Sequence, residues 1–169
     1  GPITAETPAN PQSFYGIAKN ALRQSALLLA KQKGADLHWL RAYYLYGDDE
    51  LNNSIFSKLL AAAREGKETF PFNSGRNKYD FLSIHELAHQ IAAAASQAEG
   101  TGIINCCSGQ PVSLAEMVER FIRERNLSIR LDYGAFPDRP YDSPAVWGDN
   151  TEIVRLLAAG RFRRTEARP

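Results

Sequence analysis

Hydrophobic and polar residues follow two patterns along the chain, one with helical spacing and one of short strand-like runs. Apolar residues three or four positions apart predict helices over residues 12–33, from 53 or 54 to Gly66, up to Gln97, after Ser113, and over 151–159. Shorter runs rich in β-branched and aromatic residues predict strands at 36–46, 69–72, 79–84, 102–107 and 128–133. Helices that alternate with strands indicate the α/β fold class.

Several boundaries follow from single residues. The run 36–46 is apolar and aromatic throughout, which predicts a strand buried on both faces and paired in parallel. Pro71 donates no ladder hydrogen bond, so residues 69–72 are expected at a sheet edge. Ser113 and Glu116 form a capping box. The proline-rich residues 134–150 predict a long loop, and the arginine-rich tail after Gly160 is expected to be frayed and solvated.

The first predicted helix carries the candidate chemistry. Asn10 and Pro11 suit the start of a helix, and Gly34 suits its end. Tyr15 and Lys19 then lie four positions apart on one helix face. An ammonium beside a phenol favours the phenolate, which makes a general acid/base usable near neutral pH. By itself the spacing is a weak signal, and a packed tyrosine followed by a solvated lysine is the more common reason for it.

Composition narrows the function classes. The chain has 169 residues, of which 44% are hydrophobic and 23% charged, as expected for one globular domain with a core. A net charge of +1 gives no electrostatic case for nucleic acid or an anionic membrane. No apolar run approaches the length of a membrane span, and the N-terminus has no signal segment. The adjacent Cys106 and Cys107 read as buried thiols in a reducing compartment, so the cytoplasm is the expected location.

A second motif points to different chemistry. His85, Glu86 and His89 match His-Glu-x-x-His, the pattern of zinc hydrolases, for which Glu116 or Glu119 would have to supply a third ligand. However, a predicted strand runs directly into the motif, and Ser83 with Glu86 forms a capping box. His85 then falls at the helix edge, which argues against a zinc site.

Four motifs in order resemble the extended short-chain dehydrogenases/reductases, the group of nucleotide-sugar epimerases, dehydratases and reductases. Residues 11–19 match the family's Pro-x-x-x-Tyr-x-x-x-Lys helix, and residues 40–47 are similar to its Leu-Arg-x-x-Asn-Val-Tyr-Gly strand end. Residues 79–88 are similar to Arg-Asp-Phe-x-x-Val-x-Asp-Leu-Ala, and residues 104–109 to Tyr-Asn-x-Gly-x-Gly. Arg139-Pro140 and Asp149 fall where the family has a late Arg-Pro and Asp. The resemblance covers nearly the whole chain.

The resemblance implies a C-terminal half only. The chain has no Gly-rich strand–turn–helix fingerprint for a dinucleotide and lacks the family's catalytic Ser or Thr upstream of the tyrosine. The expected fold is therefore the C-terminal part of a Rossmann-like doubly wound fold with the small substrate-binding lobe (residues 1–160), followed by a flexible basic tail (161–169). We expect the parent protein to be an NAD(P)-dependent epimerase, dehydratase or reductase, and this part alone to be inactive.

Site residues follow from the same resemblance. Tyr15 and Lys19 are the implied acid–base pair and contact NAD or NADP, with Ala42, Tyr43, Tyr44 and Leu45 beside the nicotinamide. The resemblance also implies substrate contacts by Tyr44, Arg76, Lys78 and Arg139. Arg139 is the candidate for a phosphate contact because a guanidinium fork suits phosphate, although a surface arginine in a proline-rich loop is the equal alternative.

Two positions depart from the family pattern, and several readings stay open. Tyr44 stands where the family has Asn, and Tyr79 where it has Arg. The implied partners are a nucleotide-sugar substrate, the missing N-terminal Rossmann half, and a second copy through the helix of Tyr15. The face with Leu22, Ala26, Leu29 and Ala30 suits that dimer or the missing sheet. A non-catalytic nucleotide-sugar-binding module is the alternative function.

Overall fold

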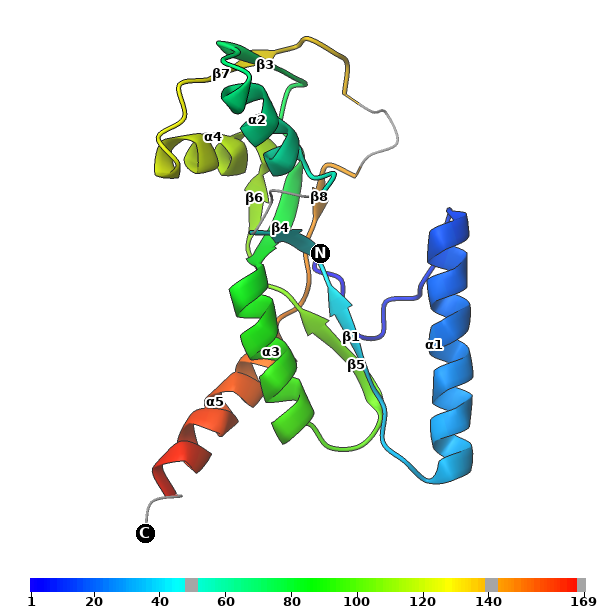
Figure 1. Cartoon of the computed structure of the whole chain (residues 1–169). Helices are drawn as coiled ribbons and strands as arrows, with labels where there is room; N and C mark the ends of the chain where they lie inside the picture. The colour runs from blue at the N-terminus through cyan, green and yellow to red at the C-terminus, as the bar shows by residue number, and fades with distance from the viewer. Residues whose placement is uncertain (48–51, 139–142, 167–169) are drawn as a thin grey trace. The chain divides into compact units, whose positions relative to one another are not determined.

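The computed structural model describes residues 1–47, 52–138 and 143–166, and the chain folds into two units (Figure 1). The first unit comprises Gly1–Ala42, Glu86–Cys107 and Gly148–Pro169. The second comprises Tyr43–His85 and Ser108–Trp147. The chain therefore passes between the units four times, and each unit is built from segments distant in sequence.

The first unit is built on two parallel strands. Strand β1 (His38–Ala42) pairs with β5 (Gly102–Cys106), from His38 opposite Gly102 to Ala42 opposite Cys106 (Figure 1). Helix α3 (Ile84–Gln97) precedes β5 in the chain, and helix α5 (Thr151–Glu166) packs against β5. Their apolar contacts form a small core of Ala94, Ile104, Ile153 and Leu156.

The N-terminal segment is tied to this sheet before the first helix begins. Ile3 forms an isolated bridge with Gly148, and the Asn105 side-chain amide donates to the Ile3 carbonyl at 2.7 Å. Arg41 donates to the Thr4 carbonyl at 3.0 Å. Side chains from both strands therefore hold the start of the described chain in place.

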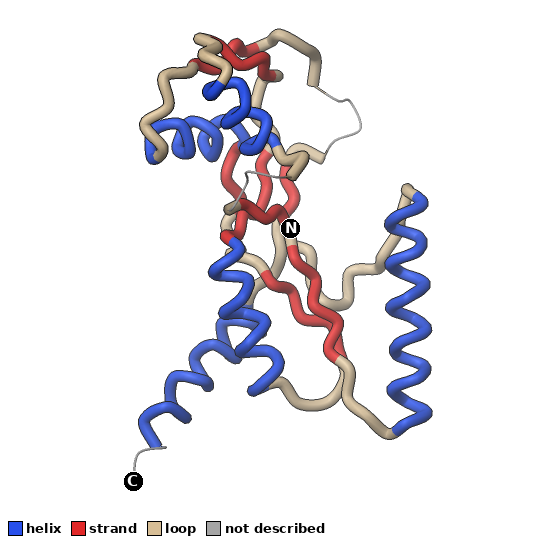
Figure 2. Tube along the Cα trace, viewed as in Figure 1, coloured by secondary structure: helices blue, strands red, loops and turns tan. Residues whose placement is uncertain are grey.

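Helix α1 (Phe14–Lys33) is the long helix that carries Tyr15 and Lys19 (Figure 2). It starts later than expected, because Ser13 rather than the Asn10–Pro11 pair caps it by accepting from the Gly16 N–H at 3.1 Å. It ends as predicted at Gly34, whose φ of 63° suits glycine and whose N–H reaches the last-turn carbonyls. Ala30 is its one buried residue.

The second unit combines two small sheets with two helices. Its strands are β2 (Tyr44–Tyr46), β3 (Thr69–Phe72), β4 (Lys78–Ser83), β6 (Pro111–Ser113), β7 (Arg130–Tyr133) and β8 (Ala145–Val146). Strand β4 is central: it pairs with β2 and β8 in parallel and with β6 antiparallel. Strands β3 and β7 form a separate parallel pair.

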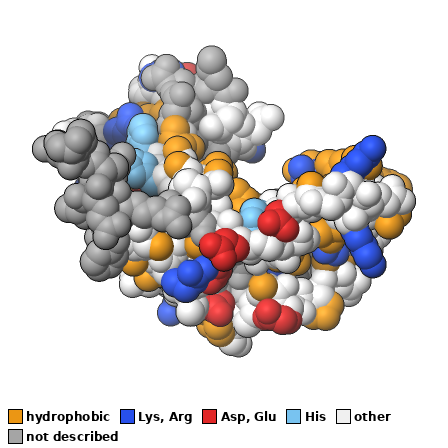
Figure 3. All heavy atoms as spheres, turned by 90° about the horizontal axis from the view of Figure 1, so that it is seen from below, with side chains coloured by type: hydrophobic (Ala, Val, Ile, Leu, Met, Phe, Trp, Pro, Cys, Tyr) orange, Lys and Arg blue, Asp and Glu red, His pale blue; other side chains and the backbone are white. Residues whose placement is uncertain are grey.

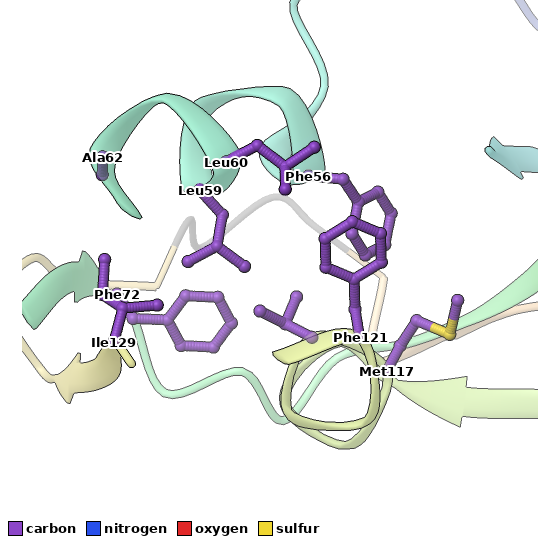
Figure 4. Close-up of a cluster of buried hydrophobic side chains, with 9 residues drawn as sticks. Phe56, Leu59, Leu60, Ala62, Phe72, Met117, Phe121 and Ile129 are labelled. Carbon is purple, nitrogen blue, oxygen red and sulfur yellow. The ribbon is translucent and has the colours of Figure 1, made fainter. Parts of the chain in front are cut away.

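Helices α2 (Ile55–Arg64) and α4 (Leu114–Glu124) enclose the core of this unit. Figure 4 shows their apolar faces turned toward each other, and the rings of Phe56 and Phe121 lie 4.9 Å apart between centroids. Ser113 caps α4, as the sequence predicts, and Ser54, one of the two expected positions, caps α2. The buried members of this core are Phe56, Leu59, Leu60, Ala62, Phe72, Met117, Val118, Phe121 and Ile129.

The α/β class and its parallel pairing are confirmed, but some expected boundaries are wrong. Residues 36–46 form two strands in different sheets, divided at Tyr43, and β1 is half-buried rather than buried on both faces. The pattern also missed β6 and β8, because strands of two or three residues are too short to show a period. Helix α5 continues past Ala159 to Glu166.

Gly75 offers a test of this packing. Its φ is +64°, and a Cβ there would lie 2.6 Å from Phe72 Cε1 and 2.7 Å from Ala115 Cβ. Gly66 has a similar φ of +73° with nothing within 4 Å. We expect Gly75→Ala to lower the free energy of unfolding by about 2–4 kcal/mol, because overpacking adds to the backbone strain.

The matched variant Gly66→Ala carries the backbone strain alone and should cost about 1 kcal/mol. Chemical denaturation gives the free energy of unfolding of each variant, and the two losses can then be compared. Equal losses would show that the segment around Gly75 relaxes away from Phe72 and Ala115.

Candidate functional site

A cavity of about 690 Å³ opens within the second unit. This volume lies in the range of small-molecule sites. Its wall is mostly aromatic and apolar, with a few polar groups. The lining residues are Tyr44, Leu45, Ser54, Ile55, Phe56, Lys58, Phe70, Pro71, Phe72, Asn73, Tyr79, Phe81, Leu114, Phe136 and Pro137.

The first turn of α2 forms the polar part of this pocket. Ser54, Ile55 and Phe56 line it at the point where the helix begins, and Lys58 follows one turn on. The N–H groups of a first helical turn and the helix dipole favour an anion. No acidic residue lies in this turn, so no carboxylate of the turn competes with a bound anion for its N–H groups. Together with the Lys58 ammonium, the turn suits a phosphate group.

Aromatic rings form the wall carried by β2 and β4. The Tyr44 and Tyr79 rings lie 4.3 Å apart between centroids, with an interplanar angle of 41°. The Phe81 ring lies 6.1 Å from each of them. Tyr44 pairs with Phe81 across the strands, and Tyr79 shares the face of Phe81 two positions away. Such rings offer flat apolar surfaces on which a base or sugar can stack.

A loop after β7 closes another side of the pocket. The Ala135 N–H donates to the Phe72 carbonyl at 3.0 Å, and Asp138 Oδ1 accepts from the Ser74 N–H at 3.1 Å. Hydrogen bonds from Ser74 hold the pKa of Asp138 below its usual range, with a smaller contribution from Arg76. These bonds hold Phe136 and Pro137, which lie between the two anchors, against β3.

The buried carboxylate of Asp80 holds β4, the strand that carries Tyr79 and Phe81 of the aromatic wall, in place. Asp80 is fully buried between Tyr79 and Phe81. Its Oδ1 accepts from the Ser108 N–H at 2.8 Å and from the Ser108 hydroxyl at 2.6 Å, and its Oδ2 accepts from the Gly109 N–H at 2.9 Å. Asp80 thereby joins β4 to the turn that leads from β5 to β6.

Tyr15 and Lys19 lie on α1, in the first unit. The Tyr15 side chain is 75% exposed, and Lys19 Nζ lies over the Trp39 ring of β1 at 5.7 Å from its centroid. Ala42, another expected contact, ends β1 and is exposed. Tyr15, Lys19 and Ala42 are therefore all exposed residues of the first unit.

The remaining expected site residues belong to the second unit. Tyr44 and Leu45 line the pocket, and Tyr43 lies half-buried between β1 and β2 in the sequence. Arg76 and Lys78 are exposed and do not line the pocket. Arg139 lies outside the described residues.

Sequence reasoning missed most of the pocket wall, above all Lys58, Phe70, Phe72 and Phe136. The alternation Phe70-Pro71-Phe72 was a usable signal, because it predicts two aromatic side chains on one face of an edge strand. Lys58 and Phe136 carry no such signal. They reach the pocket only because α2 and the loop after β7 pack beside β3.

The histidines of the His-Glu-x-x-His motif, His85 and His89, are exposed at the start of α3, and β4 runs directly into that helix. Across the described ranges, no three His, Cys, Asp or Glu side chains come together as metal ligands. No disulfide joins Cys106 and Cys107, both are buried, and burial raises the pKa of the Cys106 thiol to about 11. Among the helices described, none is both long and apolar enough to cross a bilayer.

Parallel strands joined by helices, with Tyr15 and Lys19 one turn apart on a long helix, define part of a Rossmann-like α/β protein. The chain belongs to the NAD dependent epimerase/dehydratase family, whose model matches residues 1–107.

Individual relatives agree with this family. The chain is 53% identical over 149 residues to dTDP-6-deoxy-L-talose 4-dehydrogenase (NAD(+)) of Aggregatibacter actinomycetemcomitans, an alignment that covers 88% of this chain and 55% of that protein. It is 28% identical over 178 residues to putative UDP-arabinose 4-epimerase 4 of Arabidopsis thaliana, covering 92% of this chain and 40% of that protein. The chain thus spans about half the length of the curated relatives it matches.

A solved structure shares the fold. UDP-N-acetylglucosamine 4-epimerase from Methanobrevibacter ruminantium M1, in complex with UDP-N-acetylmuramic acid, superposes with a TM-score of 0.77 at 19% identity. The match covers 92% of this chain and 50% of that one.

The Asp80 carboxylate gives a prediction for this site. Asp80→Ala leaves the N–H groups of Ser108 and Gly109 without that buried acceptor. We expect the free energy of unfolding to fall by about 2–4 kcal/mol, because the half-buried donors lose their acceptor and the side chain removed is itself fully buried. Asp132→Ala, on the exposed surface of β7, should change it by less than about 0.5 kcal/mol. Denaturant titration compares the two, and similar values would contradict the role given to Asp80.

Proposed function

We propose that the chain is the C-terminal part of an NAD-dependent enzyme that transfers hydride at C4 of a dTDP-linked 6-deoxyhexose. The observation that carries this proposal is the 53% identity, over 88% of the chain, to a protein named dTDP-6-deoxy-L-talose 4-dehydrogenase (NAD(+)). The wider family also contains epimerases and dehydratases, which share this half of the fold. Identity at this level favours the dehydrogenase, or the reductase that runs the same reaction backwards.

Tyr15 is the proposed general acid/base. Its exposed side chain, as the phenolate, can take the proton of the C4 hydroxyl as the C4–H bond breaks, and the phenol so formed can return that proton in the reverse direction. Lys19, one turn on, can donate to a cofactor ribose. Both side chains are accessible on α1, as this role requires.

The residues of this chain fit one end of NAD. Tyr15, Lys19 and the exposed Ala42 at the carboxyl end of β1 suit the nicotinamide side, since ligands of open parallel sheets bind at the carboxyl ends of strands. Bound NAD supplies the hydride acceptor for the sugar carbon. The glycine-rich turn that would hold its pyrophosphate is not in this sequence.

The pocket of the second unit is the proposed site for the nucleotide. The first turn of α2 and Lys58 would hold the diphosphate, and Phe70, Phe72 and Phe136 would enclose the thymine base. The volume of about 690 Å³ suits a nucleotide. The pocket lies wholly within one unit, which also supports the alternative of a non-catalytic nucleotide-sugar-binding module.

Helix α1 supports the proposal of a further partner. Leu22, Leu28 and Leu29 are more than half exposed, and hydrophobic side chains are visible on this helix, at the right of Figure 3. Ala30 is buried and Ala26 half-buried, whereas Leu22 and Leu29 are exposed, so the expected four-residue face is only partly covered within this chain. The N-terminal half of the parent protein, or α1 of a second copy, would cover Leu22 and Leu29.

The central test is substitution of Tyr15 in the protein encoded by the complete reading frame. We expect Tyr15→Phe to lower kcat for NAD-dependent oxidation of dTDP-6-deoxy-L-talose about 10²–10⁴-fold with little change in KM, because it removes only the proton-transfer group. NADH absorbance measures the rate. Tyr133→Phe, which removes a surface hydroxyl bonded to Glu119 at 2.6 Å, is the matched control and should retain full activity. A Tyr15→Phe enzyme of normal kcat would end the proposal of acid–base catalysis.

The 169-residue chain by itself gives a second prediction. It should bind dTDP through the pocket but show no NAD-dependent turnover, because one half of the dinucleotide site is absent. Calorimetric titration with dTDP and with NAD⁺ separates the two parts. Turnover by this polypeptide alone would contradict the proposed division, whereas dTDP-sugar binding without turnover in the complete protein would favour the binding module.

A further inference from the structure

Trp39 lies on the face of β1 that is turned away from the small core of the first unit. Side chains alternate along a strand, and Leu40 packs against that core, so Trp39 and Arg41 lie on the opposite face. On this face Arg41 donates to the Thr4 carbonyl of the segment before α1. Trp39 is half-buried and belongs to neither hydrophobic core, so core packing does not account for an indole at this position.

The Trp39 ring contacts the lysine of the proposed acid–base pair. Lys19 Nζ lies 5.7 Å from the ring centroid, within the range of a cation–π interaction. Within the described part of the chain, this ring is the one partner identified for the Lys19 ammonium. Helix α1 buries only Ala30, so little other packing limits the rotamers of its side chains. The contact with Trp39 therefore restricts a lysine that would otherwise move freely in solvent.

We propose that Trp39 is a positioning residue, which holds the Lys19 ammonium beside β1 so that it can donate to the ribose of NAD. This proposal rests on the proposed function, which assigns that ribose contact to Lys19. Trp39 lies three residues before Ala42, at the end of β1 where the nicotinamide side is proposed to bind. The ring attracts the charge through its face and offers no acceptor atom, so the three N–H donors of the ammonium stay available for ribose hydroxyl groups.

The gain in affinity comes from order in the free protein. A solvated lysine has many rotamers, and a ligand that fixes one of them loses affinity for that reason. A lysine already held over a ring loses less rotamer freedom when NAD binds. Fixing one such side chain changes a dissociation constant by about 3- to 10-fold, so an effect of that size is expected for the cofactor.

A double-mutant cycle tests the proposal through binding of NAD⁺ rather than turnover. In the complete protein, calorimetry gives the Kd of NAD⁺ for Trp39→Leu, for Lys19→Met and for the double variant. We expect Trp39→Leu to weaken binding about 3- to 10-fold. In the Lys19→Met background the same change should alter the Kd by less than about twofold, because the ammonium that the ring holds is gone.

Two further variants separate positioning from a structural role. Trp39→Phe keeps an aromatic face and should stay within about twofold of the unsubstituted Kd. Trp147→Leu makes the matched change at the other tryptophan, which is half-buried in the second unit, and should leave the Kd of NAD⁺ unchanged. Circular dichroism reports whether each variant is folded.

The positioning role is overturned if Trp39→Leu binds NAD⁺ as tightly as the unsubstituted protein or more tightly, if it loses equally in both Lys19 backgrounds, or if Trp39→Phe loses as much as Trp39→Leu. A complete protein that binds no NAD⁺ would overturn it as well. The proposed function fails separately, when NAD⁺ binds but is not reduced on addition of dTDP-6-deoxy-L-talose. The cycle does not depend on the sugar, so its result is read in the same way in that case.

Discussion

The hydrogen bonds that the buried Asp80 carboxylate accepts from Ser108 and Gly109 are the interactions on which the arrangement of the second unit depends. Asp80 is fully buried at the centre of β4. A charge removed from water is tolerated only when donors satisfy it, so the position of the Ser108–Gly109 turn is closely determined. The residues on either side of Asp80 point the other way along the strand, into the pocket. One carboxylate thus links the path of the chain between β5 and β6 to the aromatic wall.

The first unit is stabilised differently. Its sheet has two strands and its core is small, and α1 buries only Ala30. A helix of this length is stabilised in proteins mainly by packing of an apolar face, and here most large apolar side chains of that helix are exposed. Its Ser13 cap and Gly34 end define the helix without that packing. The contrast supports the proposal that further protein covers α1.

The proposed division of labour matches these physical differences. The pocket, enclosed by two helices and two short sheets, is complete within one unit and can discriminate ligands through shape and hydration. The proposed acid–base pair, Tyr15 and Lys19, lies on an accessible helix, where a proton can be exchanged once substrate and cofactor lie beside it. Under this proposal, nucleotide binding and proton transfer depend on different elements, so mutations can separate them.

The sequence by itself determined the elements whose signals are local. Ser113 and Gly34 set helix ends through a side chain or backbone freedom of their own, and the spacing of Tyr15 and Lys19 follows from the helical turn. The ordered motifs also identified the family, because they combine residue type with spacing. Only the tertiary structure decided that residues 36–46 divide between two sheets at Tyr43. The run carries no break in its sequence, and the two strands pair with partners 64 and 37 residues further along the chain (His38 with Gly102, Tyr44 with Phe81). The contact between Tyr44 and Tyr79, and the approach of Lys58 and Phe136 to one cavity, were likewise decided by pairing between distant segments. No local pattern encodes which faces will meet across such distances.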